Sequence, residues 1–162
     1  MLKKLDIESI ISSDKDGISK AQKLILPGVG SFDTAIKNLK TMGLFDVLNE
    51  RVMVDKIPVL GICLGMQLLT NGSEEGQEEG FGWIKAPTKK FTFTDDRFKV
   101  PVMGWNFVKR FKKSRLFNEM DDETRFYFVH SYYVKVDHEE DIITSSFYGI
   151  EYTSSVEREN IL

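Results

Sequence analysis

The first part of the chain, residues 1–70, alternates short apolar runs with segments whose apolar positions recur at helical spacing. The runs at 7–11, 23–27 and 57–62 predict strands, and the second of these is expected to be buried and to end at Pro27. Because helical segments separate the runs, this order predicts a parallel sheet with helical crossovers.

Three helical segments are expected between these runs. A short one is predicted at 18–21. Ser31 is placed to cap a longer helix that Gly43 ends, and a second short helix follows Gly43. The apolar faces of these last two helices are Phe32, Ala35, Ile36 and Leu39, and then Leu44, Phe45, Val47, Leu48 and Val52.

Residues 71–80 interrupt the apolar pattern with a polar, strongly acidic stretch. We expect a mobile surface loop whose carboxylates are solvated. The acidic side chains have no spacing typical of metal ligands, so a metal site is not expected here.

After Gly80 the pattern changes to short runs rich in aromatic and β-branched residues, separated by turns such as Asp95-Asp96 and Tyr148-Gly149. Such runs favour antiparallel hairpins. We therefore expect an α/β fold in which antiparallel strands are appended to the parallel sheet. The expected strands are 81–84, 90–93, 106–110, 125–129, 132–136, 142–148 and 150–154.

Length and composition narrow the class of protein. A chain of 162 residues is expected to form one domain, 1–162, with enough material for a core. Its 22 basic and 25 acidic residues give a formal net charge of −3, whereas nucleic-acid binders are normally basic. No apolar run approaches the ~18 residues of a membrane helix, and the N-terminus lacks the apolar core of a signal peptide. We therefore expect neither a nucleic acid nor a membrane as a partner, and no cofactor.

The single cysteine lies in the most informative stretch, Gly61-Ile62-Cys63-Leu64-Gly65. An apolar run leads into this stretch and a helical pattern follows it, which is the order of a nucleophile elbow. Cys63 would then lie at a helix N-terminus, where backbone N–H groups favour the thiolate, and the Leu64 N–H would point to a forming oxyanion. The alternative is a buried core thiol. One cysteine allows no intrachain disulfide, which favours a reducing cytoplasm.

A second glycine turn, Pro27-Gly28-Val29-Gly30-Ser31, also lies between an apolar run and a helix. A dinucleotide site would need a third small residue where this chain has Asp33. The turn could be purely structural, or it could present free N–H groups to an anion or oxyanion. Because the carboxyl ends of neighbouring parallel strands meet at one crevice, this turn and the Cys63 turn could face the same substrate.

The two histidines are weaker candidates for chemistry. His130 stands among apolar and aromatic residues, where a hydrogen-bonded core or edge histidine is commoner than a base. His138 lies in the polar turn Asp137-His138-Glu139-Glu140 and is expected to be solvated.

Taken together, several strings of this chain resemble the class I glutamine amidotransferases, and within them the glutaminase subunits of imidazole glycerol phosphate synthase. The resemblance runs in order along nearly the whole chain. The matching strings are Leu26-Pro27-Gly28-Val29-Gly30-Ser31-Phe32, Pro58–Gln67, Met103-Gly104-Trp105-Asn106, Tyr127–Tyr133, Tyr148-Gly149-Ile150 and Ser155-Val156.

The resemblance implies a flavodoxin-like domain that hydrolyses glutamine to glutamate and ammonia. By analogy, Cys63 is the nucleophile, and the backbone of Leu64 and Val29 lies in the oxyanion region. The residues implied in substrate binding are Gly28, Gly30, Gln67, Ser131 and Tyr132. Those implied on the side of a TIM-barrel synthase subunit, which receives the ammonia through a tunnel, are Trp105, Asn106 and Tyr127.

This chain also differs from the family that it resembles. In the family, a His-Pro-Glu string near the C-terminus completes the catalytic triad, and neither His130 nor His138 matches it. In other members of the family, a strand and a helix precede the segment that resembles residues 7–13 of this chain. A histidine is also usual in the family at the position of Val102. We therefore expect a glutaminase clipped at both ends, with an incomplete fold and little or no activity.

The sequence also allows other functions. The chain could serve an amidotransferase for amino sugars of surface polysaccharide, or act as a truncated, non-catalytic partner subunit. It could also be another cysteine hydrolase of the same fold, such as a γ-glutamyl hydrolase or a peptidase.

Overall fold

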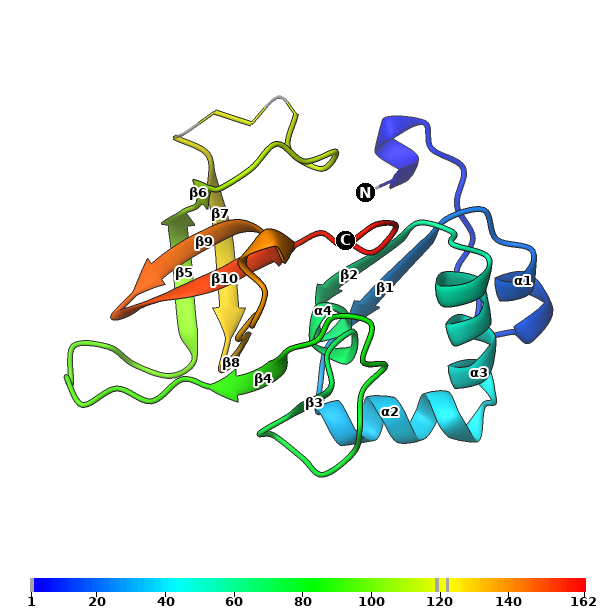
Figure 1. Cartoon of the computed structure of the whole chain (residues 1–162), viewed down its shortest axis with the longest axis horizontal. Helices are drawn as coiled ribbons and strands as arrows, with labels where there is room; N and C mark the ends of the chain where they lie inside the picture. Colours follow the sequence, from blue (N-terminus) through cyan, green and yellow to red (C-terminus); the bar gives the residue numbers. More distant parts are fainter. Residues whose placement is uncertain (1, 119, 122) are drawn as a thin grey trace.

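The structure is a computed structural model that describes residues 2–118, 120–121 and 123–162. It has a helical part built around a parallel strand pair and a second part built almost wholly of strands (Figure 1). The helices of the first part are η1 (Leu2–Leu5), α1 (Lys15–Ser19), α2 (Phe32–Thr41), α3 (Leu44–Asn49), the π-helix η2 (Glu50–Val54) and α4 (Leu64–Leu68), and its strands are β1 (Leu24–Gly28) and β2 (Val59–Cys63). The second part contains β3 (Gly72–Ser73), β4 (Pro87–Lys90), β5 (Val102–Phe107), β6 (Lys109–Arg110), β7 (Arg125–His130), β8 (Tyr132–Val134), η3 (Glu139–Asp141), β9 (Ile142–Tyr148) and β10 (Ile150–Val156).

Strands β1 and β2 are parallel and in register from Leu24 opposite Val59 to Gly28 opposite Cys63. The chain crosses from one strand to the other through α2, α3 and η2, which confirms the predicted parallel pair with helical crossovers. The last residues of the chain also pair with β2. Ile161 forms a parallel bridge to Val59, and the N–H of Gly61 donates to the carbonyl of Leu162 at 2.8 Å.

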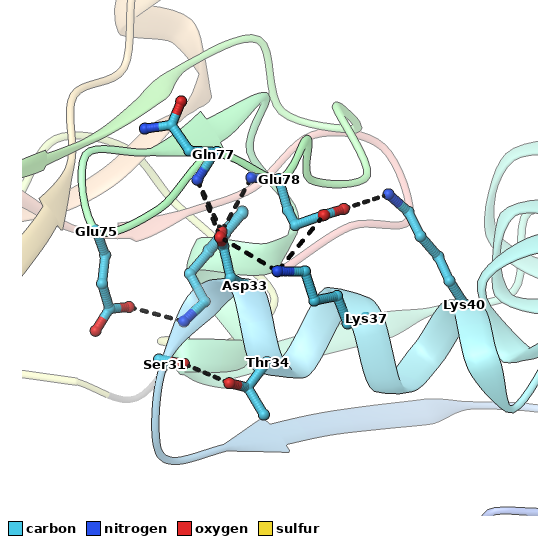
Figure 2. A network of polar contacts seen from close by, with 9 residues as sticks. Ser31, Asp33, Thr34, Lys37, Lys40, Glu75, Gln77 and Glu78 are labelled. Atoms are coloured by element: carbon cyan, nitrogen blue, oxygen red, sulfur yellow. Dashed lines mark hydrogen bonds and ion pairs between the residues drawn. The ribbon is translucent and has the colours of Figure 1, made fainter.

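Helix α2 forms as the apolar spacing predicts, and it buries Phe32 and Ile36 completely. Gly43 ends the helix with a φ of +63°, which costs glycine little because it lacks a Cβ. The predicted side-chain cap by Ser31 is wrong. The Ser31 hydroxyl donates to Thr34 instead, at 2.8 Å, and the carboxylate of Glu75 accepts the Phe32 N–H at 2.8 Å (Figure 2).

The second part confirms the appended antiparallel strands. A sheet runs in the order β3-β4-β8-β10-β9-β6, and all its pairs except β3–β4 are antiparallel. Strands β9 and β10 form a hairpin that turns at Gly149, whose φ is +70°. Strands β5 and β7 form a separate antiparallel ribbon, with Trp105 opposite Tyr127.

Two predicted strands are wrong. Residues 7–11 have no regular structure, and the side chains of Ile10 and Ile11 are exposed, because no strand among the described residues pairs with them. Residues 81–84 are also irregular, although Trp83 and Ile84 are buried. Their backbone bonds to the end of α4 and the residue that follows it, through Phe81 N–H to the Leu68 carbonyl and Ile84 N–H to the Leu69 carbonyl, rather than to a strand.

Other predicted bounds shift. The helix expected at 18–21 is α1, which starts at Lys15 because Asp14 caps it by accepting the N–H of Gly17 at 2.8 Å. The strand expected at 90–93 is β4, which ends at Lys90. The run 106–110 is divided between β5 and β6, which belong to different sheets. Strand β1 is only partly buried, since its Ile25 side chain is exposed.

Candidate functional site

Cys63 lies at the sharp turn between β2 and α4, with φ of +56° and ψ of −116°. A positive φ is unfavourable for any residue with a Cβ, and such strain persists where the surrounding structure enforces it. The Cys63 side chain is exposed. The alternative of a buried core thiol is therefore wrong, and the geometry is that of a nucleophile elbow.

Two glycines allow this turn to form. A Cβ added to Gly65 would overlap the carbonyl oxygen of Leu26, and one added to Gly61 would lie 2.8 Å from the Cα of Met66. Helix α4 therefore touches the backbones of both β1 and β2. This close approach explains why the chain has glycine on each side of Cys63.

The second glycine turn lies beside the elbow, as predicted. Gly28 is the register partner of Cys63, so both turns are at the carboxyl end of the strand pair. Gly30 has a φ of +100° and open space around it, and the side chain of Val29 is 93% exposed. Within the described residues, the N–H groups of Val29 and Gly30 donate no hydrogen bond. These free donors suit an anion or a developing oxyanion.

A cavity of about 280 Å³ opens beside Cys63. Its wall contains Gln67 from α4, Tyr127 and His130 from β7, and Tyr132 from β8, so the structure brings these predicted residues together with Cys63. The other predicted residues do not line this cavity: Gly28, Val29, Gly30, Leu64, Trp105, Asn106 and Ser131.

His130 is half-buried, and its Nδ1 lies 2.7 Å from the carbonyl oxygen of Tyr132. Burial lowers the pKa of His130, and the hydrogen bond to Tyr132 opposes this shift. The ring makes no hydrogen bond to Cys63 among the described residues. The prediction of a hydrogen-bonded histidine is therefore confirmed. The prediction for His138 is also confirmed, because its side chain is half exposed beside Glu140.

The predicted partner residues lie on the β5–β7 ribbon. The rings of Trp105 and Tyr127 meet edge to face at 5.7 Å between centroids, and both side chains are more than half exposed. Asn106 is fixed through its side-chain amide, which donates to the Phe147 carbonyl at 2.6 Å. Met103 and Val129, which lie opposite each other on the same face of the ribbon as Trp105 and Tyr127, are also exposed. The ribbon thus presents an apolar face, and Tyr127 joins that face to the cavity.

Comparison with known proteins decides the family. The family model described as "Glutamine amidotransferase class-I" matches residues 3–160. The chain belongs to this family. It is 51% identical over 161 residues to "Imidazole glycerol phosphate synthase subunit HisH 2" of Methanococcus maripaludis, and the match covers 99% of this chain and 79% of that protein. It is 45% identical to a protein of the same name from Pseudomonas aeruginosa, with the same coverage.

The fold agrees with the family. A solved structure titled "Crystal structure of glutamine amidotransferase" superposes with a TM-score of 0.73, covering 99% of this chain and 77% of that chain. Its sequence identity is 18%, so this comparison bears on the fold alone. The predicted flavodoxin-like α/β fold with appended strands is confirmed.

The acidic loop of this amidotransferase is attached to the first turn of α2, as Figure 2 shows. The carboxylate of Asp33 accepts the N–H groups of Gln77 and Glu78 at 3.0 Å, and Lys40 pairs with Glu78 at 2.6 Å. The two backbone N–H groups hold the pKa of Asp33 below its usual range. The prediction of freely solvated carboxylates is therefore wrong for Glu75, which accepts the Phe32 N–H at the start of α2, and for Glu78, which pairs with Lys40 near the end of that helix. It is also wrong for Glu74, which pairs with Lys89.

Several residues of the cavity wall are not among those predicted from the sequence. Tyr152, Thr144 and Ser154 come from the β9–β10 hairpin, and Phe128 comes from β7. The Thr144 hydroxyl lies 2.7 Å from that of Ser154, so this wall is partly polar. Alternation along β10 could have placed Tyr152 and Ser154 on one face of the strand, but it could not have shown that this face turns toward Cys63.

The residues that the structure describes contain no group of three potential metal ligands. Among the same residues, no helix is long and apolar enough to cross a membrane.

Proposed function

We propose that this chain is the glutaminase subunit of a cytoplasmic imidazole glycerol phosphate synthase, which serves histidine biosynthesis. The subunit hydrolyses glutamine to glutamate and ammonia, and the ammonia passes to a TIM-barrel synthase subunit. The observation that carries the proposal is the pairing of Cys63 with Gly28, which places an exposed thiol beside a turn with free N–H groups.

In this reaction the Cys63 thiolate attacks the side-chain amide carbon of glutamine. A carbon–sulfur bond forms, and the carbonyl oxygen becomes an oxyanion that the N–H groups of Leu64 and Val29 would stabilise. The carbon–nitrogen bond then breaks, and the leaving nitrogen takes up, through solvent, the proton that the thiol has lost, so that ammonia departs. Water hydrolyses the glutamyl thioester, which releases glutamate and restores the thiol.

Gln67 and the turn at Ser131 and Tyr132 are proposed to hold the α-amino and α-carboxylate groups of glutamine. Gln67 and Tyr132 share the cavity with Cys63, which supports this assignment. Leu64 begins α4 and is buried against the Gly28 turn, since a Cβ added to Gly28 would lie 3.0 Å from the Leu64 Cβ.

The TIM-barrel subunit is proposed to cover the apolar face of the β5–β7 ribbon. Trp105 and Tyr127 are exposed on this face. Tryptophan and tyrosine are among the residue types that contribute most to binding at protein interfaces. Because Tyr127 also lines the cavity, a partner bound here would stand next to the point where ammonia is released.

Binding measurements test this arrangement. We expect Trp105→Ala and Tyr127→Ala each to weaken binding to the barrel subunit of a close relative's synthase by about tenfold or more, as measured by calorimetry. Met42→Ala is the matched control, because Met42 is an exposed apolar residue at the end of α2 in the other part of the molecule. Unchanged affinity in both aromatic variants, with the relative's own glutaminase subunit binding normally, would contradict the proposed interface.

A further inference from the structure

His130 joins the two ends of the turn between β7 and β8. It is the last residue of β7, and its Nδ1 reaches across Ser131 to the carbonyl of Tyr132, the first residue of β8, at 2.7 Å. A carbonyl oxygen only accepts, so Nδ1 carries the hydrogen and the ring donates it. The side chain therefore closes this turn in the manner of a backbone hydrogen bond.

Aromatic rings fix the imidazole in this position. The rings of Phe91, Tyr152 and Phe128 lie 5.3, 5.4 and 5.6 Å from it between centroids. Its Nε2 is buried and has no partner among the described residues, so a second ring proton would have no acceptor. Burial also lowers the pKa of His130, which agrees with a neutral ring that donates only through Nδ1.

The turn directs its carbonyls into the protein. The Tyr132 carbonyl accepts from His130, and the Ser131 carbonyl accepts the Phe91 N–H at 3.0 Å. Within the described residues, the N–H and the hydroxyl of Ser131 donate no hydrogen bond. Donors without acceptors, on a turn whose carbonyls are already bonded elsewhere, suit a carboxylate ligand.

We propose that His130 is a positioning residue for glutamine: by holding the Tyr132 carbonyl, it fixes the turn whose flanking residues His130 and Tyr132 line the cavity, so that the free donors of Ser131 between them can bind the substrate α-carboxylate. This inference rests on the proposed function and adds to it a side chain that does not touch the reacting atoms. It assigns to His130 a role in substrate affinity and none in the activation of Cys63.

Alkylation of Cys63 separates these roles, because a thiolate reacts with an electrophile without a general base. The first probe is a chloromethyl ketone analogue of glutamine, which keeps both α-substituents and loses chloride when the thiolate attacks. The second is iodoacetamide, which loses iodide in the same way but lacks the α-substituents. We expect His130→Phe to raise the half-saturating concentration of the glutamine analogue about five- to tenfold. The rate with iodoacetamide and the maximal rate with the analogue should stay within about twofold of those of the unaltered protein.

Two conservative variants test the geometry of the hydrogen bond. The amide nitrogen of an Asn side chain lies close to the place of Nδ1, whereas that of Gln lies closer to the place of Nε2. We therefore expect His130→Asn to recover most of the lost affinity and His130→Gln to recover little.

The outcomes distinguish the two proposals. Equal half-saturating concentrations in the unaltered protein and in His130→Phe, while glutamine still protects both proteins, would overturn the role of His130 alone. Equal recovery by Asn and Gln would also overturn it. If the unaltered protein does not prefer the glutamine analogue and is not protected by glutamine, the proposed function itself fails.

Discussion

The polypeptide 1–162, tested alone, is expected to hydrolyse glutamine about 10⁴–10⁶ times more slowly than the same polypeptide carrying a C-terminal His-Pro-Glu segment from a close relative. That range is typical of removing one or more members of a catalytic triad, whose contributions are not additive. Among the described residues, Cys63 has no hydrogen-bonded base, and the nearby His130 donates its proton to Tyr132. A thiolate can attack the amide carbon without a neighbouring base, but it cannot protonate the leaving nitrogen.

Glutamate release, measured for both polypeptides at saturating glutamine, checks this expectation. Cys63→Ala in the longer polypeptide is the control and should fall to the background rate. Equal rates for the two polypeptides would contradict the prediction and would mean that a residue within 1–162 supplies the proton transfer.

Gly65→Ala is expected to reduce the free energy of unfolding by about 3 kcal/mol or more, at the upper end of the effects of single substitutions. The added methyl group would overlap the Leu26 carbonyl oxygen, so α4 would have to move away from β1. Because α4 begins directly after Cys63, this movement would also disturb the elbow.

Chemical denaturation of Gly65→Ala and of the unaltered protein measures this difference in the free energy of unfolding. Gly72→Ala is a matched control, because a Cβ at Gly72 would have its nearest neighbour at an ordinary 3.5 Å and the backbone there needs no positive φ. We expect the control to cost less than about 1 kcal/mol. If Gly65→Ala were as stable as the control, the close contact between α4 and β1 would not exist in solution.

The pattern of apolar and turn residues is sufficient to predict the helices and strands whose partners are close in the sequence. The apolar spacing of α2, the Gly43 stop and the β9–β10 hairpin around Gly149 were predicted nearly to the residue. Residues 81–84 have the apolar content of a strand but lie against the end of α4, and nothing in their own sequence indicates that contact. Residues 7–11 show the reverse case: this apolar run forms no strand, since no strand in the part of the chain that the structure describes pairs with it.

The candidate site, like the fold, could be predicted only in part from the sequence. The elbow glycines are visible in the sequence, and the rule for parallel strands correctly brought Cys63 and Gly28 together. Contacts between distant segments could not be foreseen. The bond from the Phe32 N–H to Glu75 spans 43 residues, and the cavity wall at Tyr152 depends on how the hairpin folds over β7. The family resemblance, rather than the pattern, pointed to Ser131 and Tyr132.

If Cys63 is the nucleophile, its exposed thiol meets the amide carbon of glutamine beside the Gly28 turn. Peptide mapping by mass spectrometry after reaction with the chloromethyl ketone analogue of glutamine measures which residue is labelled. We expect one modified residue, Cys63, whose labelling L-glutamine prevents and D-glutamine does not. Labelling that is unaffected by L-glutamine, or that falls mainly on other residues, would contradict it.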